Sequence, residues 1–136
     1  MGDFMKLLKK YATFFLIGSI GYGIIELLWR RRTHFTMLLA GGICFILFSL
    51  IAEKQKTKPL AIKAALTALC ITAVELIFGV IFNIILKMQV WDYSAQPLNL
   101  FGQICPLYTL LWGILALIFL PIADLINRRL EHRLAE

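Results

Sequence analysis

The sequence has little charge and few cysteines, and each scarcity excludes a class of protein. Charged residues make up 16% of the 136 residues, whereas soluble domains carry about 25%. Hydrophobic residues make up 60%, which is too apolar for a soluble domain of this size. The three cysteines, Cys44, Cys70 and Cys105, form no C-x-x-C pair, so we expect free thiols. The composition predicts a single membrane domain over residues 1–136.

Sequence motifs for catalysis, nucleotide hydrolysis and metal binding are also missing. The chain has no G-x-x-x-x-G-K-[ST] loop, no Ser-His-Asp set and no H-E-x-x-H motif. His34 and His132 each lack a second ligand at metal spacing. We therefore expect no enzyme activity, no cofactor and no metal site, and a membrane-embedded enzyme is the third-ranked alternative. Nucleic acid is not an expected partner, because the 14 Lys and Arg lie at the ends of apolar stretches.

Four apolar stretches occupy nearly the whole chain. About 20 helical residues cross the hydrocarbon core of a bilayer, so we predict an all-α polytopic membrane protein with four transmembrane helices at about residues 11–29, 35–52, 60–86 and 104–126. A basic amphipathic segment, residues 1–10, precedes the first span, which we interpret as a retained anchor. We expect Pro121 to kink the last span or to mark its exit from the bilayer, and residues 127–136 to form a surface helix.

The distribution of lysine and arginine predicts the orientation of the spans. Short cytoplasmic loops retain positive charge. One side of the membrane would hold ten basic residues, namely Lys6, Lys9, Lys10, Lys54, Lys56, Lys58, Lys63, Arg128, Arg129 and Arg133. The other side would hold four, namely Arg30, Arg31, Arg32 and Lys87. We therefore expect both termini in the cytoplasm, and contacts of the outer arginines with lipid phosphates or nearby acids.

Two of the predicted spans contain a glutamate, and an ionisable residue inside a span commonly marks a functional site. Glu75 lies near the middle of its span, without a basic residue within one turn and with Asn83 among its nearest polar neighbours in the sequence. It is either an acid that binds a proton or cation, or a hydrogen-bonded acid that fixes helix packing. Glu26 precedes Arg30 by four residues, and this spacing favours a structural ion pair.

A turn-rich aromatic segment separates the third and fourth spans. Trp91, Asp92 and Tyr93 fall at the predicted outer interface, where aromatic rings anchor membrane proteins. Alternatively, the polar groups of Asp92, Tyr93, Asn99 and Gln103 belong to a segment that dips back into the membrane. Irregular backbone at that depth must be buried in protein or line a cavity. We favour a cap, with a pocket as the alternative.

The two halves of the chain share a pattern. Both read Glu-Leu followed by Leu-x-Gly-x-Ile-Cys, at residues 26–27 and 39–44 in the first half and 75–76 and 100–105 in the second. If the pattern records a duplication, the spans form two parallel hairpin repeats related by an axis along the bilayer normal. Glu26 and Glu75 would then occupy equivalent places and face one another. The alternative is convergence, because Leu, Ile and Gly are common in membrane helices.

The run W-D-Y-S-x-x-P-L-N-L-x-G-Q-I-C at residues 91–105, with E-L-L-W-R at 26–30 and T-H-F at 33–35, resembles small bacterial membrane proteins described as putative ABC-transporter type IV or ABC transporter permease. The resemblance covers about residues 21–125 and implies a four-span protein of the bacterial inner membrane. The matching positions are Glu26, Trp29, Arg30, Glu75, Trp91, Asp92, Tyr93, Pro97, Asn99, Gly102 and Cys105.

Together these observations predict a small transporter or channel that is dimeric and binds a cation or proton through intramembrane carboxylates. The candidate ligand- or ion-binding residues are Glu75, Glu26, Asp92, Asn99, Gln103, Tyr93, Asn83 and Arg30. The alternative is a non-transporting membrane subunit or scaffold of a larger complex such as an ABC transporter, with the outer segment as its recognition surface. The expected partners are membrane lipids and either a second copy of the chain or a partner membrane subunit.

Overall fold

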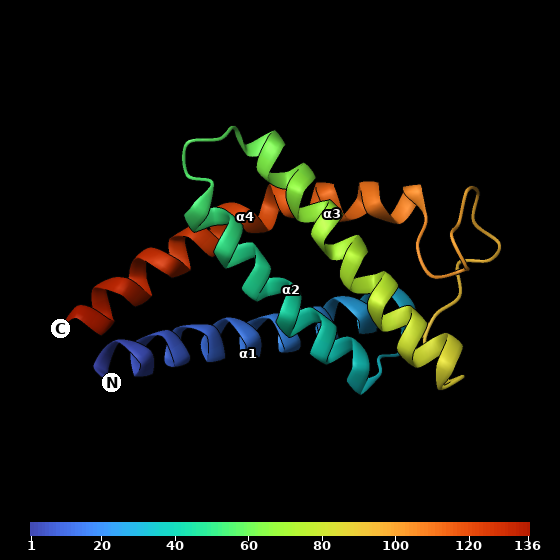
Figure 1. Cartoon of the computed structure of the whole chain (residues 1–136), viewed down its shortest axis with the longest axis horizontal. Helices are drawn as coiled ribbons and strands as arrows, with labels where there is room; N and C mark the ends of the chain where they lie inside the picture. Colours follow the sequence, from blue (N-terminus) through green and yellow to red (C-terminus); the bar gives the residue numbers. More distant parts are fainter.

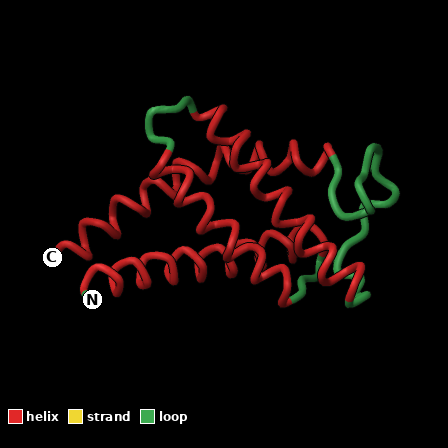
Figure 2. Tube along the Cα trace, in the orientation of Figure 1, coloured by secondary structure: helices red, strands yellow, loops and turns green.

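A computed structural model describes all 136 residues as an all-helical chain (Figure 1). Its elements in order are α1 (Gly2–Arg30), α2 (Phe35–Lys54), α3 (Leu60–Phe78), the π-helix η1 (Gly79–Ile85) that continues α3, and α4 (Pro106–Ala135). Figure 2 shows that the longest irregular segment joins η1 to α4. The four helical stretches, with η1 counted as part of the third, are long and apolar enough to cross a membrane. The chain is a multi-pass membrane protein, as the sequence predicted.

Two helices extend beyond the predicted spans. Helix α1 begins at Gly2, so the amphipathic segment before the first predicted span belongs to the same unbroken helix. Its Leu, Lys and Met residues have high helix propensity. Helix α4 continues through Pro121 to Ala135, and the predicted surface helix is therefore its last part. Figure 1 shows the two halves of α4 running in different directions, as expected when a proline removes a backbone hydrogen bond.

Helix α2 is the central element of the bundle. It contacts all three other helices, whereas α1 packs mainly on α2 and scarcely touches α4. The backbones of α1 and α2 approach closely at Gly18 and Gly41, where an added Cβ would clash with the facing helix. The Thr72 and Thr109 hydroxyl groups, 2.8 Å apart, join α3 to α4. The pairs α1/α2 and α3/α4 make the larger contacts, but a parallel repeat stays a prediction.

The apolar core fills the space between the helices in the half of the bundle that contains the termini. The rings of Phe14 from α1 and Phe45 from α2 lie with their centroids 5.2 Å apart and their planes tilted, and alanines of α3 and α4 belong to the same core. The buried members of this core are Phe14, Phe45, Phe48, Ala52, Ala64, Ile71, Ala116, Leu120 and Ala123. Because lipid is as apolar as these side chains, close packing supplies much of the stabilisation.

Two buried polar contacts join helices near the termini, which lie close together in Figure 1. The Lys10 ammonium of α1 forms an ion pair with Glu53 of α2, and lies 3.7 Å from Glu131 of α4. The Ser49 hydroxyl donates to Asn127 Oδ1 at 2.7 Å, and Asn127 Nδ2 donates to the Ser49 carbonyl at 3.2 Å. Both side chains are fully buried, so each polar group depends on the other.

The Ser49–Asn127 pair gives a stability prediction. Asn127→Ala should lower the free energy of unfolding by about 1–2 kcal/mol, because it leaves the Ser49 groups without their interhelical partner. Ser49→Ala should cost about the same or less, and the double variant should cost less than the sum. Unfolding in mixed micelles measures all three, with Leu125→Ala on the outer face of α4 as a control. Strictly additive effects would contradict the coupling.

Candidate functional site

The irregular segment between η1 and α4, residues 86–105, is held against the π-helix by two amide side chains. Asn83 Nδ2 donates to Gln103 Oε1 at 2.8 Å, and Asn83 Oδ1 accepts from the Val90 backbone N–H at 2.8 Å. Gln103 packs directly over Gly79, where an added Cβ would meet its side chain at 2.5 Å. The missing side chain at Gly79 therefore makes room for the loop. Gly79 is the first residue of the π-helix η1. Short π-helical segments occur often at functional sites.

Hydrogen bonds within the loop fix its shape. Asn99 Nδ2 donates to the carbonyl groups of Ser94 and Gln96 at 3.1 and 3.0 Å, and Asn99 Oδ1 accepts from the Gly102 N–H at 3.0 Å. Gly102 has a φ of 71°, which glycine adopts without strain. Asp92 Oδ1 accepts from the Ser94 N–H at 2.9 Å, and this hydrogen bond holds the pKa of the Asp92 carboxyl group below its usual range.

The loop places a tyrosine over the acid of the third span. Glu75 is 7% exposed, and its Oε1 accepts a hydrogen bond from the Tyr93 hydroxyl at 2.9 Å. Burial and the adjacent Glu75 raise the pKa of Tyr93 above its usual range, so the phenol remains a donor. Glu75 Oε2 and the Trp112 Nε1–H are both buried without a hydrogen-bond partner. The Trp112 indole lies near this carboxyl group as a second potential donor, although the two groups make no hydrogen bond of normal geometry.

The acid of the first span lies in a different arrangement. Glu26 is 3% exposed, and its Oε2 lies 3.4 Å from Arg30 Nη1, which is the ion pair expected from the spacing. Neither Glu26 oxygen makes a hydrogen bond. Arg30 Nη2 instead donates to the Val90 carbonyl at 2.7 Å. One guanidinium thus joins α1 to the loop and pairs with Glu26.

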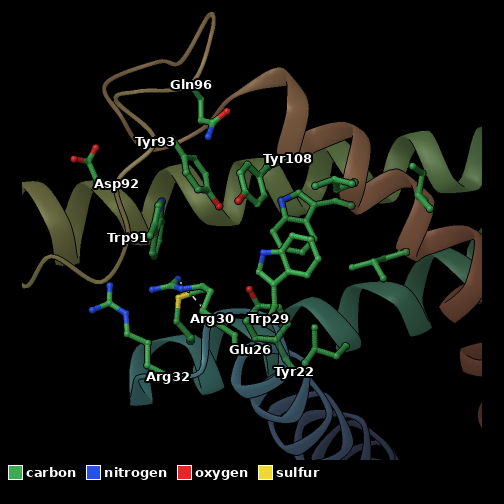
Figure 3. Close-up of a pocket in the computed structure, with 16 residues that line it drawn as sticks. Tyr22, Glu26, Trp29, Arg30, Arg32, Trp91, Asp92, Tyr93, Gln96 and Tyr108 are labelled. Carbon is green, nitrogen blue, oxygen red and sulfur yellow. Dashed lines mark ion pairs between the residues drawn. The ribbon is translucent and has the colours of Figure 1, made fainter.

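These groups border a cavity of about 480 Å³ between α1, the start of α2, the loop and α4. Figure 3 shows Tyr93 and Tyr108 pointing toward one another above Tyr22, Glu26 and Trp29. Tyr93 and Tyr108 are stacked, with ring centroids 4.5 Å apart and planes 9° apart. The aromatic lining residues are Tyr22, Trp29, Trp91, Tyr93, Tyr108 and Trp112. The volume suits a small organic molecule.

The structure divides the sequence-predicted site residues into two groups. Glu26, Arg30, Asp92 and Tyr93 line the cavity, whereas Glu75 lies behind Tyr93 as its hydrogen-bond acceptor. The other three support the loop, and are Asn83, Asn99 and Gln103. Through these contacts the segment over residues 86–105 is held against the third helical stretch, and its aromatic residues also line the cavity.

Sequence reasoning missed three aromatic residues of the wall. Tyr22 precedes Glu26 by four residues, and Tyr108 precedes Trp112 by four, so each pair shares a helix face. This spacing was the available signal. Tyr22 lies near both Glu26 and Glu75.

Comparison with known proteins places the whole site within one family. The family model described as putative ABC-transporter type IV matches residues 12–135, which include every residue that lines the cavity. No curated protein and no solved structure matches the chain. The chain therefore belongs to the putative ABC-transporter type IV family.

Proposed function

We propose that the chain is a small transporter or channel of the bacterial inner membrane, that it works as a homodimer, and that its intramembrane carboxylates bind a cation or proton. The observation that carries this proposal is the free Oε2 of Glu75, which is buried without a hydrogen bond. The family description supports an association with ABC transport. The role is binding and translocation rather than catalysis.

The electrostatics of a buried acid support this assignment. An ionised carboxylate in a low-dielectric interior must be paired with a cation or must take up a proton. Glu26 has Arg30 as a partner, whereas the ion pairs of the structure do not include Glu75. Tyr93 satisfies one oxygen of Glu75 and supplies no positive charge. A proton or a bound cation completes the site at Glu75.

The burial of Glu75 favours a second candidate function. A carboxyl group that is 7% exposed and hydrogen-bonded to the loop also serves to fix helix packing. In that case the chain is a non-transporting subunit that packs against a larger membrane partner. The ordered outer loop, residues 86–105, would be its recognition surface.

Flux measurements separate the two functions. Purified protein in proteoliposomes should support pH-dependent ion or solute flux, and Glu75→Gln should abolish proton-linked flux because the amide cannot take up or release a proton at this site. The measurement is internal pH and tracer uptake under an imposed proton gradient. Circular dichroism and size-exclusion chromatography should show that the variant folds.

Glu136→Gln provides the matched control, because it makes the same chemical change on the exposed end of α4. Flux through this variant should equal that of the wild type. If no tested ion or solute moves through the wild-type protein, the subunit function replaces the transport proposal. Full activity in Glu75→Gln would remove Glu75 from the mechanism.

The proposed orientation gives a separate prediction. The termini lie at one end of the bundle, with Lys6, Lys9 and Arg133 among the basic residues near them (Figure 1). Alkaline phosphatase, which is active only outside the cytoplasm, should be inactive when fused after Glu136 and active when fused after Gln96, because basic ends remain cytoplasmic. The reverse pattern of activity would invert the orientation.

A further inference from the structure

The cavity wall combines aromatic faces from three parts of the chain. Ring contacts run from Trp91 to Tyr93 at 6.4 Å, on to Tyr108 at 4.5 Å, then to Trp112 at 6.3 Å and to Tyr22 at 6.2 Å. The loop, α4 and α1 thus contribute to one continuous aromatic surface. Aromatic faces carry partial negative charge and attract cations within about 6 Å of the ring.

Two acids, Glu26 and Asp92, and two bases, Arg30 and Arg32, also border the cavity. Glu26 lines the wall with two carboxylate oxygens that make no hydrogen bond. Both arginines direct a guanidinium nitrogen to the Val90 carbonyl, at 2.7 and 3.5 Å. The Val90 carbonyl therefore takes up part of the hydrogen-bonding capacity of both arginines. Arg30 Nη1 also lies 3.4 Å from Glu26 Oε2, so a cation in the cavity would compete with Arg30 for this carboxylate.

Glu75 adds to the negative character of the same aromatic surface, although it does not itself line the cavity. Its carboxyl group accepts the hydrogen bond of Tyr93, whose ring lines the cavity. A negative charge at the phenol hydroxyl raises the electron density of the ring, and a bound cation gains from it. Both acids thus act on one space, Glu26 directly and Glu75 through Tyr93.

We propose that this cavity binds an organic cation, a lipophilic ammonium or phosphonium ion, between the aromatic rings and Glu26. The inference rests on the proposed function and names its substrate class. A volume of about 480 Å³ accommodates an organic ion. Divalent metal ions are coordinated by several oxygen atoms at short range, whereas six aromatic residues dominate this wall. An organic anion would meet the negative faces of those rings, with Arg30 and Arg32 as its attractive groups.

The three tryptophans of the chain, Trp29, Trp91 and Trp112, all line the cavity. Their fluorescence therefore reports occupancy without a label. We would titrate protein in neutral detergent with tetraphenylphosphonium and, separately, with tetraphenylborate, which has the same shape and the opposite charge. Tetraphenylphosphonium should give a saturable change in fluorescence, and tetraphenylborate should bind at least about tenfold more weakly.

Two variants test the wall itself. Glu26→Gln should weaken tetraphenylphosphonium binding by about tenfold or more, because it removes the charge and keeps the shape. Tyr108→Leu should weaken it by about two- to thirtyfold, the range of one lost cation–π contact. Glu136→Gln, on the exposed tail, should bind as the wild type does. Circular dichroism and size-exclusion chromatography confirm that each variant folds.

The wild-type comparison decides the proposal even if a variant fails to fold. Equal or non-saturable responses to the two ions would mean partition into an apolar surface and would overturn the proposal. Preference for tetraphenylborate would overturn it in favour of an anion site at the arginines. Unchanged binding in folded Glu26→Gln would also overturn it.

The binding assay is independent of the flux assay. Saturable binding of tetraphenylphosphonium without flux of any ion supports the site and contradicts transport. Proton-linked flux without such binding contradicts the organic-cation site and leaves the transport proposal standing.

Discussion

The packing of the loop, residues 86–105, against the π-helix η1 is the constraint on which the rest of the site depends. The hydrogen bond between the Asn83 and Gln103 amides holds the loop against η1. The absence of a side chain at Gly79 makes room for Gln103. This contact positions Trp91, whose indole donates to the Gln103 carbonyl at 3.0 Å, and Tyr93, which covers Glu75. Without it, the aromatic wall would lose its outer part and the carboxyl group of Glu75 its donor.

The two acids are stabilised by different means, which gives them different roles. Glu26 lies one turn before Arg30, and the same guanidinium reaches the Val90 carbonyl of the loop. Glu26 is therefore paired within the fold. Glu75 has a neutral donor only, so the stability of its ionised form depends on what else enters the site. A low-dielectric surrounding makes that dependence strong.

The sequence predicted the helices well and the site in part, because each depends on interactions of different range. Apolar runs set the four spans, and a four-residue spacing revealed the Glu26–Arg30 pair. The Tyr93–Glu75 hydrogen bond depends on how residues 86–105 fold back. That path includes residues such as Lys87 and Leu98 with positive φ, a conformation for which their side chains give no sequence signal. The π-helix likewise depends on a tertiary contact at Gly79.

The arrangement of helices suggests how such a cavity becomes accessible. Helix α1, which contributes Tyr22, Glu26 and Trp29 to the wall, packs mainly on α2 and scarcely on α4. A small change in the angle between α1 and α4 would therefore widen the cavity while the larger α1/α2 and α3/α4 contacts persist. Arg30 resists this movement, since its hydrogen bond to Val90 joins α1 to the loop. A cation bound at Glu26 would compete with the Arg30 guanidinium for the same carboxylate, so occupancy and opening are coupled through Arg30.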